Sequence, residues 1–276
     1  MIPDRAKAAR DILAFYVEAG VDTAIGEAPN DYLAGDPMPP ATVESATPSV
    51  APPTPGPARR PSPSAPPPMP AQTAPPGADT AVMAAREAAR NAKTMDELRA
   101  ILESFDGCAL KATASRLVFA DGNPRARVMF VGEAPGRDED IEGLPFVGRS
   151  GKLLDKMLAA IGLDRTKVYI ANIVPWRPPG NRTPTPVETQ ICLPFLLRQI
   201  ELCAPDVVVT MGNPSTQTLL QTSDGITRTR GRWFPFKSGD RDIRVLPTFH
   251  PAFLLRSPLQ KRFVWRDFLA IKKALG

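Results

Sequence analysis

We predict an α/β fold for this chain, a three-layer α/β/α sandwich with a central, mostly parallel sheet. Short apolar runs rich in β-branched residues alternate with longer segments of helical periodicity from about residue 115 onward. This alternation is typical of strand–helix units, whose strands pair in parallel beneath helices on both faces. Glycine-rich or polar segments follow several expected strands, which favours a binding site at their carboxyl ends.

Composition divides the chain into three parts. Residues 35–80 are rich in proline, alanine, serine and threonine, and 16 of the 33 prolines lie between Pro37 and Pro76. Such a segment lacks the side chains of a packed core, so we expect a disordered linker biased to polyproline II. Residues 81–276 have the length of one domain and are the expected catalytic part.

The N-terminal part, residues 1–34, holds one amphipathic segment. The spacing of its apolar residues predicts a helix of about four turns. Alone it is too short to fold, so it docks on the larger domain, stays partly disordered or binds a protein partner as a tether. The residues that share the apolar side are Ala8, Ile12, Leu13, Tyr16 and Val17.

The C-terminal part supplies the expected strands and helices in order. The expected strands cover residues 116–119, 128–131, 168–173, 207–211 and 243–246. The expected helices cover residues 85–92, 94–103, 151–161, 186–202, 214–221 and 260–274. Thr94 and Glu97 have the spacing of a capping box, which favours a helix start at that point.

Charge and cysteine content limit the class of protein. Residues 80–276 carry 29 Lys and Arg against 20 Asp and Glu, whereas residues 1–79 carry 5 against 9. A basic domain commonly binds a polyanion such as nucleic acid. We expect neither a membrane span nor secretion, because no apolar run approaches about 18 residues and no leader is visible. Three cysteines, which cannot form an even disulfide framework, fit a cytoplasmic protein.

The segment from residue 128 to 152, VMFVGEAPGRDEDIEGLPFVGRSGK, combines several functional features. An apolar strand ends in the turn Gly-Glu-Ala-Pro-Gly, which brings the carboxylate of Glu133 to the strand end. Phe146 offers an exposed aromatic ring further along. Backbone donors of Gly148, Arg149 and Ser150 then open a helix, where they can bind a phosphate.

Two other strand ends carry polar side chains. His250, the single histidine, follows an expected strand and precedes a proline; a lone histidine is usually structural, but this loop position favours a functional one. Asn172 can donate and accept at once, so it either reads a nucleobase edge or closes a turn. Arg177, Asn181 and Arg182 belong to a proline-rich loop that either follows a phosphodiester chain or is simply solvated.

These motifs together resemble a known family. The segments GEAPGRDED, PFVGRSG, ANIVPWRPPGNRTPTP and THPAFLLR occur in the order and spacing of the family four uracil-DNA glycosylases, and the resemblance covers residues 100–275. It implies the glycosylase sandwich and a monomeric hydrolase of DNA repair. Such an enzyme flips uracil out of single- or double-stranded DNA, cleaves its N-glycosidic bond and leaves an abasic site.

The resemblance also implies roles for individual residues. Glu133 positions or activates water, Asn172 pairs with the uracil edge, and His250 donates to uracil O2 as a neutral imidazole. The uracil pocket is implied to be formed by Gly132, Ala134, Pro135, Gly136, Phe146 and Asn172. DNA contacts are implied for Gly148, Arg149, Ser150, Arg177, Asn181 and Arg182, with Phe253, Leu254 and Leu255 as a wedge in the base stack and Arg256 on a phosphate.

The sequence departs from its relatives at two places. Ala134 stands where other superfamily members have an aspartate, so stabilisation of the leaving group must dominate. The family's four-cysteine iron–sulfur ligand set retains Cys108 and Cys192, but Phe105 and Trp176 stand at the other two positions. Cys203 lies too far along a helix to replace either. We therefore expect no iron–sulfur cluster and no other cofactor, with the aromatic rings filling the space.

Alternative functions remain open at this stage. The chain could be a damaged-base or abasic-site binding protein with little turnover, since Ala134 departs from other superfamily members and the altered cysteine set departs from the family. It could also prefer another deaminated base, such as hypoxanthine or xanthine. A nucleotide-binding Rossmann enzyme is disfavoured, because no G-x-G-x-x-G follows the first long strand.

Overall fold

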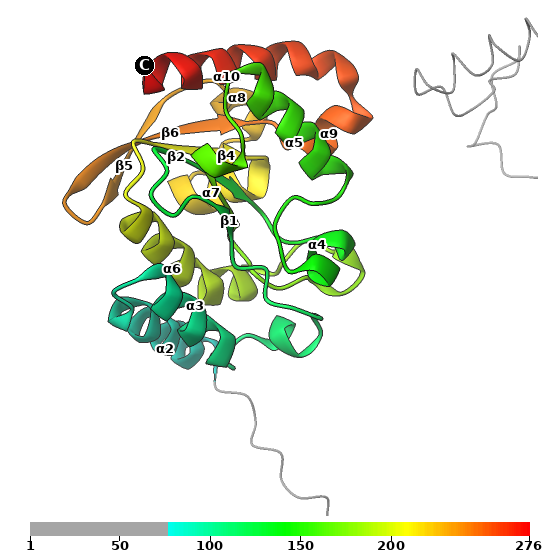
Figure 1. Ribbon diagram of the computed structural model, residues 1–276. Helices are drawn as coiled ribbons and strands as arrows, with labels where there is room; N and C mark the ends of the chain where they lie inside the picture. The colour runs from blue at the N-terminus through cyan, green and yellow to red at the C-terminus, as the bar shows by residue number, and fades with distance from the viewer. Residues whose placement is uncertain (1–76) are drawn as a thin grey trace, which may run out of the picture. The chain divides into compact units, whose positions relative to one another are not determined.

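A computed structural model describes residues 77–276, which form helices on both faces of a central sheet (Figure 1). The expected N-terminal helix and nearly all of the expected linker lie outside the described residues. The linker prediction is wrong at its C-terminal end, because residues 78–80 already belong to helix α2 (Ala78–Asn91). The run of alanine with Met83, Arg86 and Glu87 has high helix propensity, and the helix extends back along it to residue 78.

The sheet has six strands in the order β1-β3-β2-β4-β6-β5. Its four central strands pair in parallel, and each edge strand pairs antiparallel. The predicted fold class, a sandwich with a mostly parallel sheet, is thereby confirmed. The strands are β1 (Asp121–Gly122), β2 (Val128–Gly132), β3 (Tyr169–Asn172), β4 (Val207–Met211), β5 (Phe234–Ser238) and β6 (Arg241–Thr248).

The register aligns the carboxyl ends of the central strands. Gly132 of β2 lies opposite Asn172 of β3, and Met211 of β4 lies opposite Thr248 of β6. From β2 the chain crosses to β3 on one side, and it then returns to β4 on the other side of β2. Such a reversal leaves a crevice outside the strand ends, where ligands bind in open α/β sheets.

Side chains along each central strand alternate between two apolar cores. Val128 and Phe130 pack with helices α5 (Arg149–Ala160), α9 (Pro251–Arg256) and α10 (Lys261–Leu275). Met129 and Val131 pack with α2, α3 (Met95–Ser104) and α6 (Pro186–Cys203) on the opposite face. Figure 1 shows these two helical layers, one on each side of the sheet. Burial on both faces explains the nearly continuous apolar runs of the central strands.

Most expected elements form within two residues of their expected bounds, and the exceptions have physical causes. Thr94 caps α3 by accepting from the Glu97 amide at 3.2 Å, as predicted. Residues 116–119 are not a strand, and the short edge strand β1 pairs with β3 instead. Strand β5 was not predicted, because Pro235 lies inside the run and argues against a strand; the edge position of β5 accommodates it.

Four further elements lie in the connections between these strands and helices. Helix α4 (Arg137–Glu142) follows β2, and α7 (Asn213–Leu220) and α8 (Ile226–Thr229) follow β4. The 3-10 turn η2 (Arg165–Lys167) joins α5 to β3. Within residues 77–276, none of the helices combines the length and the apolar character that a bilayer span requires.

Candidate functional site

A pocket of about 780 Å³ opens at the carboxyl ends of the four parallel strands. Its lining includes Glu133 from the end of β2, Asn172 from the end of β3 and His250 from the end of β6. Phe146, from the loop between α4 and α5, lines the same pocket, but it is only 5% exposed, so the expectation of an exposed ring is wrong. It belongs to the apolar core that includes α5. The structure therefore brings together the acid, amide, imidazole and aromatic ring that the sequence singled out.

Close packing around Gly132 shapes the floor of this pocket. A Cβ atom on Gly132 would lie 2.3 Å from the Asn172 Oδ1 atom and 2.7 Å from the Phe146 Cζ atom. Only a residue without a side chain lets the amide and the ring approach the end of β2 in this way. Gly132 thus holds the pocket's shape from behind, and it is not itself among the lining residues.

The Asn172 side chain is buried, with 4% of its surface exposed, and its Oδ1 atom has no hydrogen-bond partner within residues 77–276. A buried carbonyl oxygen without a donor costs free energy, and native structures rarely keep one without a reason. Since this oxygen belongs to a pocket-lining residue, a bound molecule with an N–H group would satisfy it.

Glu133 is the second pocket residue with an unsatisfied buried atom. Its Oε1 atom finds no partner in the described part of the chain. Burial raises the pKa of the Glu133 carboxyl above its ordinary value, and the Thr183 hydroxyl offsets part of this rise. The backbone around it is fixed, because the Val174 amide donates to the Glu133 carbonyl at 3.0 Å. A carboxyl in this setting holds its proton more readily than an exposed one, and carboxyls perturbed in this way are common at functional sites.

His250 is held as a neutral imidazole. Its Nδ1 atom accepts from the Ala252 amide at 3.1 Å, so the proton of the neutral ring resides on Nε2. Burial and, to a smaller extent, the positive charge of Arg256 lower the pKa of His250 to about 4. At neutral pH the ring therefore offers one N–H donor without a net charge.

The loop that carries His250 rests on a buried network. The Thr248 hydroxyl donates to Asp267 Oδ2 at 2.7 Å, and Arg230 forms an ion pair with the same carboxylate. The Gly212 amide donates to the Thr248 carbonyl at 2.9 Å and so ties the end of β4 to the end of β6. Gly212 has a φ of 95°, a conformation that favours glycine.

Glu139 links the turn after β2 to the start of α5. Its Oε2 atom accepts from the Gly136 amide at 3.1 Å, and its Oε1 atom accepts from the amides of Val147 and Gly148 at 3.1 and 3.0 Å. The Gly148 amide is therefore not one of the free donors expected at this helix start. Ser150 lines the pocket, whereas Gly148 and Arg149 do not.

The arginines of the proline-rich loop are engaged by side chains of the loop and of the helices beside it. Arg182 donates to both carboxylate oxygens of Glu188, at 2.8 and 2.6 Å, and this holds the pKa of Glu188 at about 2. Arg177 donates to the Asn181 Oδ1 atom at 2.7 Å. Asn181 and Arg182 line the pocket and Arg177 does not, so their expected DNA contacts stay predictions.

Helix α9 corrects part of the expected wedge. Leu254 is buried in the core with 1% of its surface exposed, so the prediction that it enters a base stack is wrong in this structure. The residues from 251 to 256 form a helix, whose turn points position 254 inward. Leu255 is 37% exposed, and Phe253 lines the pocket against Phe249, with ring centroids 4.9 Å apart.

One wall of the pocket was missed at the level of sequence. Met211, Gly212, Asn213 and Pro214 line it where β4 passes into α7. The signal was present, because an apolar strand followed by Gly-Asn-Pro has the same pattern as the other three strand ends. No acid, histidine or arginine marked this segment, so it attracted no functional prediction.

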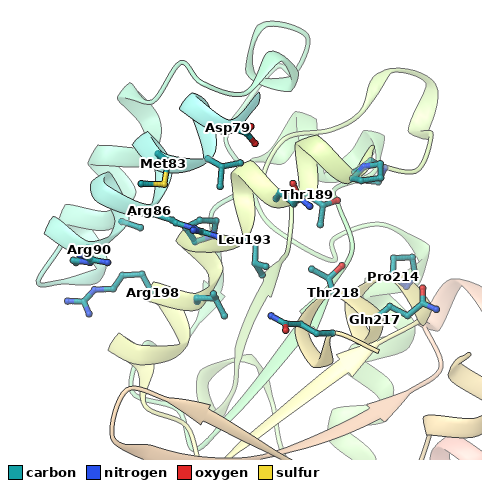
Figure 2. A pocket seen from close by; sticks show the side chains of 18 of the residues that line it. Asp79, Met83, Arg86, Arg90, Thr189, Leu193, Arg198, Pro214, Gln217 and Thr218 are labelled. Carbon is teal, nitrogen blue, oxygen red and sulfur yellow. The ribbon is translucent and has the colours of Figure 1, made fainter. Parts of the chain in front are cut away.

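A larger groove of about 1290 Å³ lies between α2, α6 and α7 (Figure 2). It shares Thr183 and Pro184, together with the start of α7, with the smaller pocket. Arg86 and Arg90 of α2 and Leu193 of α6 line it (Figure 2). His250, Asn172 and Glu133 do not line this groove, so the two unsatisfied buried oxygens lie outside it. The groups that can do chemistry are therefore in the smaller pocket.

All four expected cluster positions lie within the described residues. The Sγ atoms of Cys108 and Cys192 are 3.8 Å apart, and both side chains are buried. Trp176 is 2% exposed, and Phe105 packs edge-on against Phe195, with ring centroids 5.1 Å apart.

The third cysteine cannot complete a ligand set with this pair. The Cys203 thiol donates instead to the Ala126 carbonyl at 3.6 Å. Among the described residues, no group of three or more metal-binding side chains occurs. These donors do not fit a four-thiolate cluster, which is built on four cysteine ligands.

Comparison with known proteins agrees with this arrangement. The chain is 41% identical over 187 residues to a type-4 uracil-DNA glycosylase of Sulfurisphaera tokodaii, covering 65% of this chain and 85% of the relative. It is 39% identical over 188 residues to a type-4 uracil-DNA glycosylase of Archaeoglobus fulgidus, covering 67% and 94%. Residues 119–269, more than half of the chain, match the family model for this group, and the chain therefore belongs to the uracil DNA glycosylase superfamily.

Proposed function

We propose that this protein is a uracil-DNA glycosylase of DNA repair, which hydrolyses the N-glycosidic bond of uracil and leaves an abasic site. The observation that carries the proposal is the unsatisfied Oδ1 atom of Asn172 in the pocket. Uracil presents an N3–H donor to such an oxygen, whereas cytosine presents an acceptor at N3. A site built to hydrogen-bond one group strongly rejects a base that lacks it. The type-4 relatives support the same substrate.

Substrate binding requires the nucleotide to leave the base stack. A glycosidic bond inside a duplex is out of reach, so the enzyme flips the nucleotide into its pocket. Phe146 forms the surface on which the uracil ring stacks, and it lies next to His250, with ring centroids 5.4 Å apart. Phe253 and Leu255 fill the vacated stack from α9, and Arg256 binds a neighbouring phosphate.

Bond cleavage leaves positive charge on the sugar and negative charge on uracil, largely at O2. His250 donates its Nε2–H to that oxygen. A neutral donor fixed by the Ala252 amide needs no rearrangement as the charge develops. Because burial keeps the pKa of His250 at about 4, the ring does not protonate the base outright at neutral pH.

Glu133 acts on the positively charged sugar and on the attacking water. In its ionised form it stabilises the positive sugar and orients or deprotonates the attacking water. Its raised pKa makes it a better base than an exposed carboxylate. The methyl group of Ala134 can contribute neither effect, so stabilisation of the uracil anion supplies the larger share of catalysis. No step involves an iron–sulfur cluster.

The proposal is tested by incubating the full-length protein with an oligonucleotide that contains one deoxyuridine. We expect alkali-labile abasic sites from the wild type and from Asn123→Ala, a matched control in an exposed turn. Asn172→Ala should lose most of this activity while remaining folded. Tight binding without base release would favour the damaged-base or abasic-site binding protein, and release of hypoxanthine or xanthine alone would favour another deaminated base. Either result would overturn the proposal.

A further inference from the structure

Phe146 has an unusual backbone conformation for an aromatic residue. Its φ is 56°, in the left-handed region that bulky side chains rarely adopt. Such a conformation persists only where the surroundings hold it, and it occurs preferentially at functional sites. Some group outside the ring must therefore hold this backbone.

Close packing permits the conformation but does not fix it. A Cβ atom on Gly151 would lie 1.5 Å from the Phe146 carbonyl oxygen, so the first turn of α5 rests directly on this peptide. Glycine makes room for the carbonyl, but it forms no directed bond to it. The Val147 amide is held by Glu139 at 3.1 Å, which fixes the chain only beyond Phe146.

The Arg165 guanidinium makes the directed bonds. Its Nη2 atom donates to the Phe146 carbonyl, and its Nη1 atom donates to the Pro145 carbonyl at 3.1 Å. Two carboxylates hold the guanidinium in turn: Asp121 accepts from Nη1 at 2.6 Å, and Asp155 accepts from Nε at 2.8 Å. The fork thus spans β1, α5 and two consecutive carbonyls of the loop, and no other side chain donates to those carbonyls within residues 77–276.

We propose that Arg165 is a positioning residue for base stacking, which holds Phe146 in its left-handed conformation and so keeps the ring in the uracil pocket. The identity of the stacked base as uracil rests on the proposed function, but the positioning of the Phe146 ring does not. Arg165 belongs to η2, outside the pocket lining and outside the four motifs quoted for the family resemblance. It acts through Phe146 and touches no substrate.

Loss of this anchor should lower the fraction of molecules whose ring is in place. An affinity that depends on one conformer weakens in proportion to that conformer's population. We therefore expect Arg165→Ala to lose about tenfold or more in kcat/KM, mainly through KM. The kcat/KM of Arg165→Lys should lie between those of the wild type and Arg165→Ala, because an ammonium cannot bind two carbonyls and two carboxylates as a planar guanidinium does.

Three controls separate positioning from general destabilisation. Added guanidinium should restore much of the activity of Arg165→Ala and leave the activity of Arg198→Ala unchanged. In the wild type, Arg198 binds the Ala92 carbonyl and Glu201 away from the pocket. In a Phe146→Ala background, Arg165→Ala should cost nothing further. Additive losses, or a lower melting temperature with unchanged KM, would overturn the proposal.

A measurement without DNA keeps this test independent of the proposed function. In protein labelled with 4-fluorophenylalanine, the ¹⁹F resonance of residue 146 is identified by its absence from Phe146→Leu. We expect it to shift or broaden in Arg165→Ala and to recover with guanidinium, whereas Arg198→Ala leaves it unchanged. An unmoved resonance contradicts the positioning role. A moved resonance in a protein that releases no uracil would contradict only the proposed function. If Arg165→Ala does not fold, Asp155→Asn, which removes one anchor, is measured in its place.

Discussion

Two regions that follow from the same family resemblance differ in how completely their polar groups are satisfied. At the strand ends, Asn172 and Glu133 each keep a buried oxygen without a partner in the described chain. Around Cys108 and Cys192, apolar side chains pack together and the two thiols contact each other at 3.8 Å. The first region needs a bound molecule to complete its hydrogen bonds, whereas no buried side-chain nitrogen or oxygen around the two thiols lacks a partner within residues 77–276.

This difference separates function from stability. Residues of the pocket with unsatisfied polar atoms should affect catalysis strongly and folding weakly, because their removal costs the fold few contacts. Residues of the apolar region around Cys108 and Cys192, the closed core, should affect folding strongly and catalysis weakly. Variants in each region therefore test the assignment of both.

The largest effect on stability is expected in the closed core. Trp176→Ala removes a side chain with 2% exposure and leaves a cavity, so the free energy of unfolding should fall by about 3 to 5 kcal/mol. Denaturant unfolding measures this loss. Well below the melting temperature, kcat should change far less than in a His250 variant, and an equal loss of kcat would mean that the two regions are not separable.

The largest effect on catalysis is expected at His250. His250→Ala removes the neutral donor, and kcat should fall by about 10²- to 10³-fold, comparable to the loss of an oxyanion-hole donor. Single-turnover base release measures it. The melting temperature should fall slightly, because the variant loses the bond from the Ala252 amide at the start of α9. A fall of less than about tenfold in kcat would remove His250 from its assigned role.

A smaller effect with a distinct pH signature is expected at Glu133. The active form is the ionised carboxylate, and burial raises its pKa, so activity should fall as the pH drops through a value above the ordinary pKa of 4.5. His250, with its pKa at about 4, changes charge only below that limb. Glu133→Gln should lower kcat by about a hundredfold and abolish the limb. A limb that persists in this variant would identify a different base.

The smallest effect is expected at the cysteine pair. Replacing Cys108 and Cys192 by alanine removes two sulfur atoms from an apolar core, and should cost about 1 kcal/mol of unfolding free energy at each site with no loss of activity.

Freshly purified wild type, prepared without oxygen, should be colourless with negligible iron. Brown protein with stoichiometric iron would overturn the expectation that no cluster is bound.

The sequence predicted the fold and the pocket through different signals. Apolar runs such as 128–131 and 207–211 identified the central strands, because burial on both faces leaves few polar residues in them. Glu133, Asn172 and His250 were found because each follows such a strand. The edge strand β5 and the inward turn of Leu254 depend on packing and on the helix phase of α9, which a short segment does not reveal.

Residues that act through the backbone were harder to predict. Arg165 carries no motif, and its bonds to the Pro145 and Phe146 carbonyls arise only when η2 folds against the loop before α5. Glu139 belonged to an acidic loop in the sequence, whereas the structure gives it three backbone amides. Such roles depend on contacts between segments, for which local pattern contains no signal.

In the proposed function, the unsatisfied Asn172 oxygen selects the N3–H group of uracil. The most direct test of this selectivity compares single-turnover base release from deoxyuridine and from N3-methyldeoxyuridine, in the wild type and in Asn172→Ala. The wild type should prefer deoxyuridine by on the order of 10⁴-fold, and the variant should lose most of that preference while acting slowly on both. Equal release of the two bases by the wild type, or no release of uracil at all, would contradict the claim.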